Sequence, residues 1–309
     1  MASQTGLYLA QITDIHVGCN TLNGNTARYH LATALEELAQ LAPRPRCILA
    51  TADLVCAGRR AELQEYVGLA APCTVPIYAL PANHDLWGEP GDQAWQDLLG
   101  ASRHTIDLDG FRVILFQECL RCGQGDWEAR VSPETLAWLE AQLAAVPAGQ
   151  ALVGIHTPPL RNGADWHDRW HGTNAPEFLD LLRRYRVQAV VTGHWHRLGE
   201  WLADGVRVIN SGALTGWQWT GIPPYLSFPV RPGYTMLHWD GQTLRWSWRE
   251  LCWQEVRAKV QCSLVWIGPV HAGGPRPQVT PADIFLPVTL TAHTWTRQGA
   301  VTAVEWGVG

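Results

Sequence analysis

Five short polar motifs, each directly after an apolar segment, dominate this chain of 309 residues. The apolar segments are short, as buried β-strands are. In chain order the motifs are Asp14-Ile15-His16, Thr51-Ala52-Asp53, Ala82-Asn83-His84-Asp85, Gly154-Ile155-His156 and Gly193-His194-Trp195-His196. Because the carboxyl ends of strands in an α/β sheet line one crevice, we expect these polar side chains to converge there.

The motifs offer carboxylate, imidazole and amide groups but no thiolate. The predicted metal ligands are Asp14, His16, Asp53, Asn83, His156, His194 and His196. Oxygen and nitrogen ligands of this kind suit Mn, Fe or Zn, and two such ions close together suit attack on phosphorus. A single motif taken alone is better explained by a buried structural histidine or a strand-end cap. The full set predicts a dinuclear metal centre, because burying these groups together without an ion is costly.

Strand patterns alternate with helix patterns over most of the chain, which is typical of a layered α/β fold. The expected strands cover residues 7–13, 46–51, 75–80, 152–155, 187–191 and 206–209. The expected helices cover residues 26–41, 61–69, 93–99, 132–145 and 175–185. Antiparallel pairs are expected at 105–108 with 111–116 and at 235–239 with 244–251.

The sequence changes character near residue 252, so we expect a catalytic domain at 1–251 and a separate extension at 252–309. Residues 268–281 are rich in Gly and Pro and are interpreted as a linker. Residues 286–292 and 300–306 alternate like β-strands. Two strands alone are marginally stable, so either they pack on the main domain or the chain is cut from a longer protein.

Charge and cysteine content narrow the class of protein further. The net charge is −5 and no basic tract stands out, which argues against broad nucleic-acid binding. The first residues lack a signal-peptide pattern and no apolar run reaches the roughly 20 residues of a membrane span, so we predict a cytoplasmic protein. Cys119 and Cys122 form a lone C-x-x-C without further ligands nearby, and we expect reduced buried or loop thiols.

The ordered set D-x-H, D, N-H-D, H and G-H-x-H, over residues 7–240, resembles the calcineurin-like metallophosphoesterase family. The resemblance implies a four-layer α/β/β/α sandwich with two metals at its strand ends. It implies that one ion is held by Asp14, His16, Asp53 and His196. It implies that the other is held by Asp53, Asn83, His156 and His194, with Asp53 bridging both. His84 would stay off the metals and act as the acid, and Asp85 would orient His84 through its ring N–H.

Three positions depart from the family pattern. Ala52 and Ala82 stand where the family has Gly before the bridging Asp and before the Asn-His pair. An added methyl matters there if the backbone needs room or a positive φ. Thr157 stands where many members acting on cyclic nucleotides have a second His, which argues against assigning that substrate.

Two tryptophan-rich segments, residues 166–171 and 212–219, are expected to rim the metal cleft or to anchor its loops. The second resembles a subgroup of the family with a β-rich C-terminal extension, which fits residues 252–309.

These residues lead us to expect hydrolysis of a small-molecule phosphodiester by a hydroxide that bridges two metals, with His84 protonating the leaving group. A phosphomonoesterase or nucleotide pyrophosphohydrolase is the alternative enzyme. A degenerate binding scaffold is the non-catalytic alternative, although such members typically lose ligands and this chain keeps all seven. The motifs leave the physiological substrate, the metals and the oligomeric state open.

Overall fold

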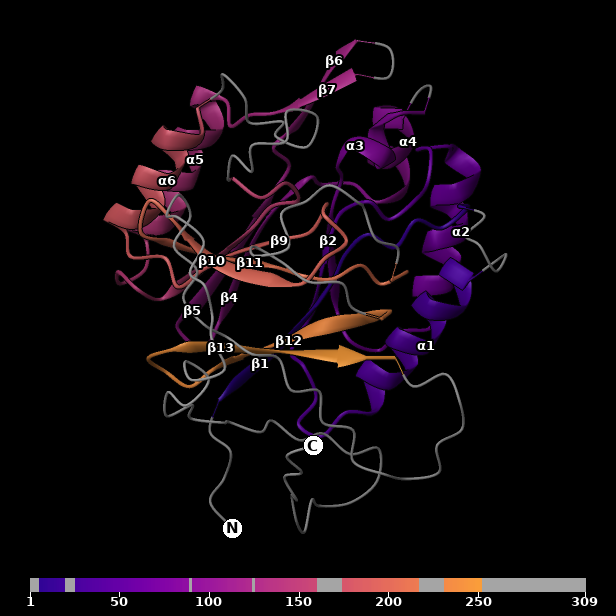
Figure 1. Ribbon diagram of the computed structural model, residues 1–309, viewed down its shortest axis with the longest axis horizontal. Coiled ribbons are helices and arrows are strands. Elements are labelled where there is room, and N and C mark those ends of the chain that lie inside the picture. Colours follow the sequence, from indigo (N-terminus) through magenta and orange to yellow (C-terminus); the bar gives the residue numbers. More distant parts are fainter. Residues whose placement is uncertain are drawn as a thin grey trace, which may run out of the picture.

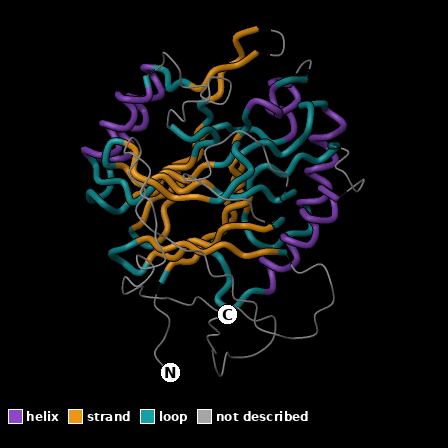
Figure 2. The backbone as a smooth tube through the Cα atoms, in the orientation of Figure 1, coloured by secondary structure: helices purple, strands orange, loops and turns teal. Residues whose placement is uncertain are grey.

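In the computed structural model of the chain, two β-sheets face each other between two layers of helices (Figure 1). The structure describes residues 6–19, 26–88, 91–123, 126–159, 174–216 and 231–251. Figure 2 shows the strands in the centre with helices on both sides. The expected four-layer α/β/β/α sandwich is therefore confirmed within these residues.

The first sheet has the strand order β13-β12-β1-β2-β3. Its strands are β1 (Leu7–Ile12), β2 (Ile48–Thr51), β3 (Ile77–Leu80), β12 (Gly233–Trp239) and β13 (Leu244–Glu250). β1, β2 and β3 are parallel, whereas β12 pairs antiparallel with both β1 and β13. β1 is buried along its whole length, as expected for a strand covered on both faces.

The second sheet has the strand order β10-β11-β9-β8-β5-β4. Its strands are β4 (Arg103–Leu108), β5 (Phe111–Phe116), β8 (Ala151–Gly154), β9 (Val190–Thr192), β10 (Gly199–Ala203) and β11 (Val206–Asn210). β5, β8, β9 and β11 run parallel, so their carboxyl ends share one edge. A separate hairpin of β6 (Cys119–Gly123) and β7 (Asp126–Ala129) stands at the same end of the molecule as α3 (Figure 1).

The helices are α1 (Thr26–Gln40), α2 (Arg60–Ala70), α3 (Asn83–Leu86), α4 (Gly91–Leu98), α5 (Pro133–Ala144) and α6 (Ala175–Arg184). Figure 1 places α1 and α2 on one side of the sheets and α5 and α6 on the other. Two apolar clusters result. Leu9 belongs to the cluster that extends between the sheets, whereas its neighbour Ala10 faces the cluster under α1 and α2.

A buried glutamine links the two sheets close to their carboxyl edge. The side-chain amide of Gln11 donates to Thr51 Oγ1 at 2.8 Å and to the Thr192 carbonyl at 2.9 Å. Gln11 lies at the end of β1, Thr51 at the end of β2 and Thr192 at the end of β9. These bonds hold the strand ends that carry three of the motifs in a fixed relation.

The predicted strands and helices agree with the observed ones to within a few residues at their ends. α3, β6, β7 and β10 are not expected from the sequence, because they are short or lack a clear apolar period. The linker and the two strands expected after residue 252 lie outside the described residues. None of the described helices is long and apolar enough to cross a membrane.

A disulfide that the sequence analysis did not predict joins Cys19 to Cys56. It connects the loop after β1 to the loop after β2, 37 residues further along the chain. Among the described cysteines, Cys47, Cys73 and Cys119 are free thiols, as expected for Cys119. The two loops also pair through a bridge between Val17 and Val55 and through the His16 N–H, which donates to the Asp53 carbonyl at 2.9 Å.

Candidate metal centre

All five motifs lie at the edge where the carboxyl ends of the parallel strands meet. Asp14 and His16 follow β1, Asp53 follows β2, and Asn83 and His84 begin α3 after β3. In the facing sheet, His156 follows β8, and His194 and His196 follow β9. The convergence follows from topology, because parallel neighbours deliver their carboxyl ends to the same side.

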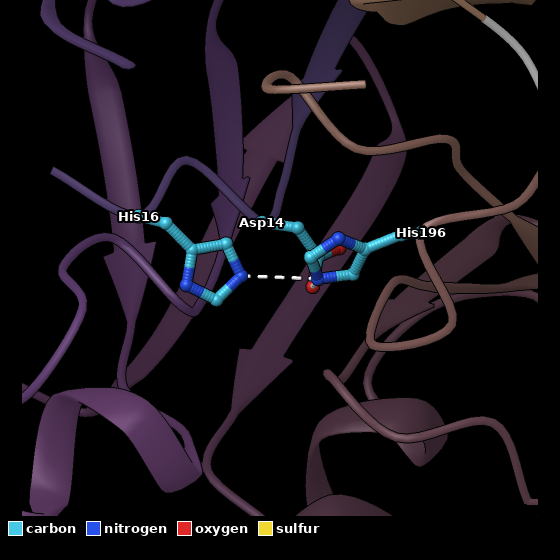
Figure 3. A group of neighbouring side chains, drawn as sticks. All are labelled: Asp14, His16 and His196. Carbon is cyan, nitrogen blue, oxygen red and sulfur yellow. Dashed lines mark hydrogen bonds and ion pairs between the residues drawn. The ribbon is translucent and has the colours of Figure 1, made fainter. Parts of the chain in front are cut away.

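Asp14, His16 and His196 form the first group of candidate ligands (Figure 3). Their side chains turn toward one another from the loops after β1 and β9. The Nε2 atoms of His16 and His196 lie 3.0 Å apart, and His196 Nε2 lies 3.1 Å from Asp14 Oδ1. Ligands about 2.0–2.1 Å from one ion are separated by roughly 3 Å, so this spacing fits a shared metal.

Asp53, His156 and His194 form the second group of candidate ligands. His156 Nε2 lies 3.1 Å from Asp53 Oδ2. The other ring nitrogen of His156, Nδ1, donates to the Thr51 carbonyl at 2.9 Å, which leaves Nε2 as the ligand atom. Metal-binding histidines are commonly oriented in this way by a backbone carbonyl.

Asp53 also belongs to a third group, with His16 and His84. Its Oδ2 atom lies 3.9 Å from His16 Nε2 and 3.1 Å from His156 Nε2. One carboxylate therefore lies between ligands of both groups. This is the position that a bridging ligand requires.

Asn83 supplies a separate test of whether a cation fits. Its side chain is 3% exposed, and its Oδ1 atom has no hydrogen-bond donor within the described part of the chain. A buried amide oxygen without a partner is costly, and a bound cation would satisfy it. The donor set of carboxylate, imidazole and amide therefore fits two metal ions, while the assignment of each ligand stays a prediction.

The ligand loops hold an unusual concentration of left-handed backbone. Five of the predicted ligands have positive φ: Asp14, His16, Asp53, His194 and His196. Non-glycine residues rarely adopt this conformation, and Asp and His tolerate it better than most. Such conformations persist only where the surrounding structure enforces them, and they cluster at functional sites.

Two loops approach each other so closely that a side chain would not fit between them. A Cβ atom on Gly193 would lie 2.1 Å from Thr13 Oγ1 and 2.5 Å from Asp14 Oδ2. The adjacent His194 N–H donates to the Asp14 carboxylate at 3.0 Å. Glycine at 193 thus allows the loop after β9 to reach the loop after β1.

Burial and crowding shift the pKa values of the candidate ligands in opposite directions. Burial would raise the Asp14 pKa, but the charges of His196 and His156 outweigh it and lower the pKa to about 2. Burial and the His196 charge lower the pKa of His16 to about 3. For His156, burial is outweighed by the Asp53 and Asp14 charges, which raise its pKa to about 10. Opposed shifts within one cluster are typical of functional sites.

His84 lies beside this cluster and is oriented by a backbone carbonyl. Its Nδ1 donates to the Cys56 carbonyl at 2.6 Å, and its ring meets that of His16 edge-on at 4.6 Å. Since a carbonyl can only accept, the proton on Nδ1 is fixed. Nε2 is then the ring nitrogen able to exchange a proton.

The prediction that Asp85 orients His84 through its ring N–H is wrong. Asp85 accepts instead from the backbone N–H groups of Leu54, Val55 and Ala82, at 2.9, 3.1 and 3.0 Å. Its place in the first turn of α3 directs the carboxylate back to the start of that helix. Asp85 therefore holds the loop that carries Asp53 against the loop that carries Asn83. Burial and the Asp53 charge raise its pKa to about 8.

Glu118 is a buried polar residue of the site that the sequence analysis missed. It is fully buried after β5, and its carboxylate accepts from the His156 N–H at 3.2 Å and the Thr157 N–H at 2.6 Å. It thereby fixes the loop that carries His156. An acidic residue two positions after the largely apolar run 111–116 was the available signal.

Of the tryptophan-rich segments, the structure describes only residues 212–216. Thr215 Oγ1 donates to the Asp14 carbonyl at 3.3 Å, and the Leu214 N–H donates to the Thr13 carbonyl at 2.9 Å. These contacts hold residues 214–215 against the loop after β1, but they involve no tryptophan, so the role expected of the tryptophans stays a prediction. Trp217, Trp219 and residues 166–171 lie outside the described residues.

Known proteins that are similar to this chain agree with the function class that the geometry of the site indicates. The family model described as calcineurin-like phosphoesterase matches residues 7–198, more than half of the chain. The chain belongs to this family. As a calcineurin-like phosphoesterase it is a hydrolase that acts on phosphoester bonds, and the expected family is confirmed.

Relatives of this phosphoesterase include two bacterial proteins that are both named as phosphodiesterases. A 3′,5′-cyclic-nucleotide phosphodiesterase of Nostoc sp. is 27% identical over 202 residues, which cover 64% of this chain and 74% of that protein. A probable glycerophosphodiester phosphodiesterase of Arcobacter nitrofigilis is 27% identical over 216 residues, which cover 67% of this chain and 78% of that protein. A dimetal phosphatase from Danio rerio shares the fold with a TM-score of 0.56 at 16% identity, covering 80% of this chain and 96% of that one.

Replacement of Asp53, which would contact both ions, should lower the metal content more than replacement of Asp14, which would contact one. We expect Asp53→Ala to lose both ions and Asp14→Ala to lose one, measured as metal per chain by elemental analysis after reconstitution with Mn. Asp97→Ala, a change on α4 at an exposed ion pair with Arg60, should keep both. Equal metal content in the Asp53 and Asp14 variants would contradict a bridging role.

The two alanines that replace family glycines should respond differently to restoration of glycine. Both are fully buried, but Ala52 has φ of 72° whereas Ala82 has φ of −137°. Ala52→Gly relieves a left-handed alanine, and Ala82→Gly only adds freedom to the unfolded chain. Ala82→Gly should lower the free energy of unfolding by about 1 kcal/mol more than Ala52→Gly does, measured by urea denaturation. The reverse order would mean that φ at residue 52 carries no strain.

Proposed function

We propose that this chain is a metal-dependent phosphodiesterase in which seven side chains hold two ions and His84 is the acid. The observation that carries the proposal is the position of Asp53. It belongs to one candidate ligand group with His156 and His194 and to another with His16 and His84. A site with one shared carboxylate is suited to two ions acting on one phosphoryl group.

One ion would be held by Asp14, His16, Asp53 and His196, and the other by Asp53, Asn83, His156 and His194. The donor set favours Mn, Fe or Zn. When bound, two such ions lower the pKa of a water molecule and polarise the phosphoryl oxygens. The protein's own contribution is to fix these donors on strained loops that the packing of two sheets enforces.

His84 would transfer the proton that the leaving alcohol needs. With Nδ1 fixed on the Cys56 carbonyl, protonated His84 presents Nε2–H as its remaining donor. Histidine suits this role because its ordinary pKa lies near neutral pH. The His84 backbone N–H also donates to Asp53 Oδ1 at 3.2 Å, which ties the acid to the shared ligand.

Two arguments favour a diester over a monoester substrate. Both bacterial relatives named above carry the name of a phosphodiesterase. The acid His84 also lies beside an exposed apolar side chain, Trp87, which suits a substituent on phosphorus rather than a bare phosphate oxygen. A monoesterase or pyrophosphohydrolase is therefore the weaker proposal.

A cytoplasmic location also stays a prediction. The Cys19–Cys56 disulfide bears on it, because disulfides persist mainly in oxidising compartments and are rare in the cytosol. Thiol quantitation on protein isolated from its native cells under alkylating conditions would decide which state prevails.

The substrate class can be tested with two chromogenic esters. With Mn bound, we expect kcat/KM for bis-p-nitrophenyl phosphate to exceed that for p-nitrophenyl phosphate. Chelation of the metal should abolish both activities, and added Mn should restore them. A preference for the monoester would favour the alternative enzyme, and inactivity on both esters despite two bound ions would favour a binding scaffold.

Replacement of His84 should reveal an acid rather than a ligand. We expect His84→Ala to keep both ions and to lose activity by a factor on the order of 10²–10⁴. The loss should be largest for alkyl esters, because an alkoxide needs the proton, and smaller for p-nitrophenyl esters. Equal losses on both esters would mean that His84 holds the phosphoryl oxygens, and loss of an ion would contradict its place outside the ligand set.

A further inference from the structure

Two apolar side chains at the end of the molecule that carries the metal centre are exposed to solvent. Trp87 directly follows α3 and is 38% exposed, and Leu120 on β6 is 37% exposed. β6 packs against α3, so the hairpin and the helix form one rim at the end of the molecule where the ligand loops lie. Exposed apolar groups at the rim of a site are suited to contact a ligand.

Trp87 lies directly against the proposed acid. The centroids of the indole of Trp87 and the imidazole of His84 are 3.9 Å apart with their planes tilted by 44°. Trp87 follows His84 by three residues in a helical turn, which places both side chains on the same face. The partly exposed indole therefore lies beside the imidazole that would protonate the leaving group.

The backbone that carries Trp87 is held firmly. A Cβ atom on Gly88 would lie 2.2 Å from the Gly58 carbonyl oxygen, and one on Gly58 would lie 2.5 Å from the Asp85 carbonyl oxygen. Gly88, the residue after Trp87, thus lies against the loop after β2 with no room for a side chain. A fixed backbone under an exposed ring gives a preformed contact surface.

A second tryptophan nearby has a different environment. Trp127 on β7 is 7% exposed and meets the ring of His194 edge-on at 5.2 Å. Its contact is with a predicted metal ligand, and little of its surface is left for a substrate. Trp127 therefore packs the hairpin onto the site, whereas Trp87 presents its ring outward.

We propose that Trp87 determines specificity by contacting the leaving group, and that the preferred substrates are phosphodiesters whose leaving alcohol carries a planar ring. This inference rests on the proposed function and adds the chemistry of the alcohol. Water loses one proton as its oxygen bonds to phosphorus, the ester P–O bond breaks, and the leaving oxygen takes the proton of His84, which the proton released by water then replaces. Because His84 and Trp87 are in contact, the group attached to that oxygen passes over the indole.

Three methyl phosphodiesters would test this role of Trp87. Their leaving groups are 2-naphthol, phenol and a fluorinated alcohol of similar acidity, so that the need for the His84 proton is matched. We expect Trp87→Ala to lower kcat/KM for the naphthyl ester by a factor on the order of 10–100, the usual worth of an aromatic stack. The loss should be smaller for phenyl and within about twofold for the fluoroalkyl ester, and Trp87→Phe should recover part of it.

Leu202→Ala is the matched control, since Leu202 is 44% exposed and pairs with Arg207 near the amino end of β11, away from the ligand edge. It should leave all three rates unchanged. Equal losses on the three esters in Trp87→Ala, or no loss on any, would overturn the role of Trp87 and leave the proposed function intact. Failure of the wild-type protein to hydrolyse any of the diesters with two ions bound would overturn the proposed function, and this inference with it.

Discussion

The structure depends on burying two carboxylates, Asp14 and Asp53, among imidazoles where two sheets meet. Both carboxylates are at most 1% exposed, and an isolated buried charge of this kind would be strongly destabilising. The neighbouring histidines offset that cost, as the Asp14 pKa of about 2 shows. Two cations would offset it further, so the same interactions that make the site costly to fold also make it suited to metal.

Two features of the backbone bring these charged side chains together: strained backbone at several predicted ligands and a close approach of two ligand loops. Five predicted ligands have left-handed φ, and Gly193 lets two loops come together where a Cβ atom would not fit. Gln11, Asp85 and Glu118 are buried and hold the ligand loops in place through hydrogen bonds to backbone or side-chain groups of those segments. The ligands are thus positioned by buried polar residues that would not touch the ions.

The surroundings of His84, the proposed acid, are organised by different contacts. The Cys56 carbonyl fixes the Nδ1 proton of His84, and Cys56 is itself bonded to Cys19 in the loop that follows His16. Trp87 covers one side of the imidazole. The proposed proton donor and the proposed surface for the leaving group therefore come from α3 and the residue directly after it, and α3 also carries Asn83.

The sequence alone determined the family, the layered fold and the residues that gather at the strand ends, because apolar strands followed by polar motifs are local patterns. Asp14, Asp53 and His196 are identified by these patterns alone. The partners of these residues were decided by the tertiary structure. Asp85 was expected at His84 but bonds to Leu54, Val55 and Ala82, Glu118 was overlooked, and Cys19 and Cys56 pair across 37 residues. Such contacts join segments far apart in the chain, and their geometry exists only after the two sheets have packed.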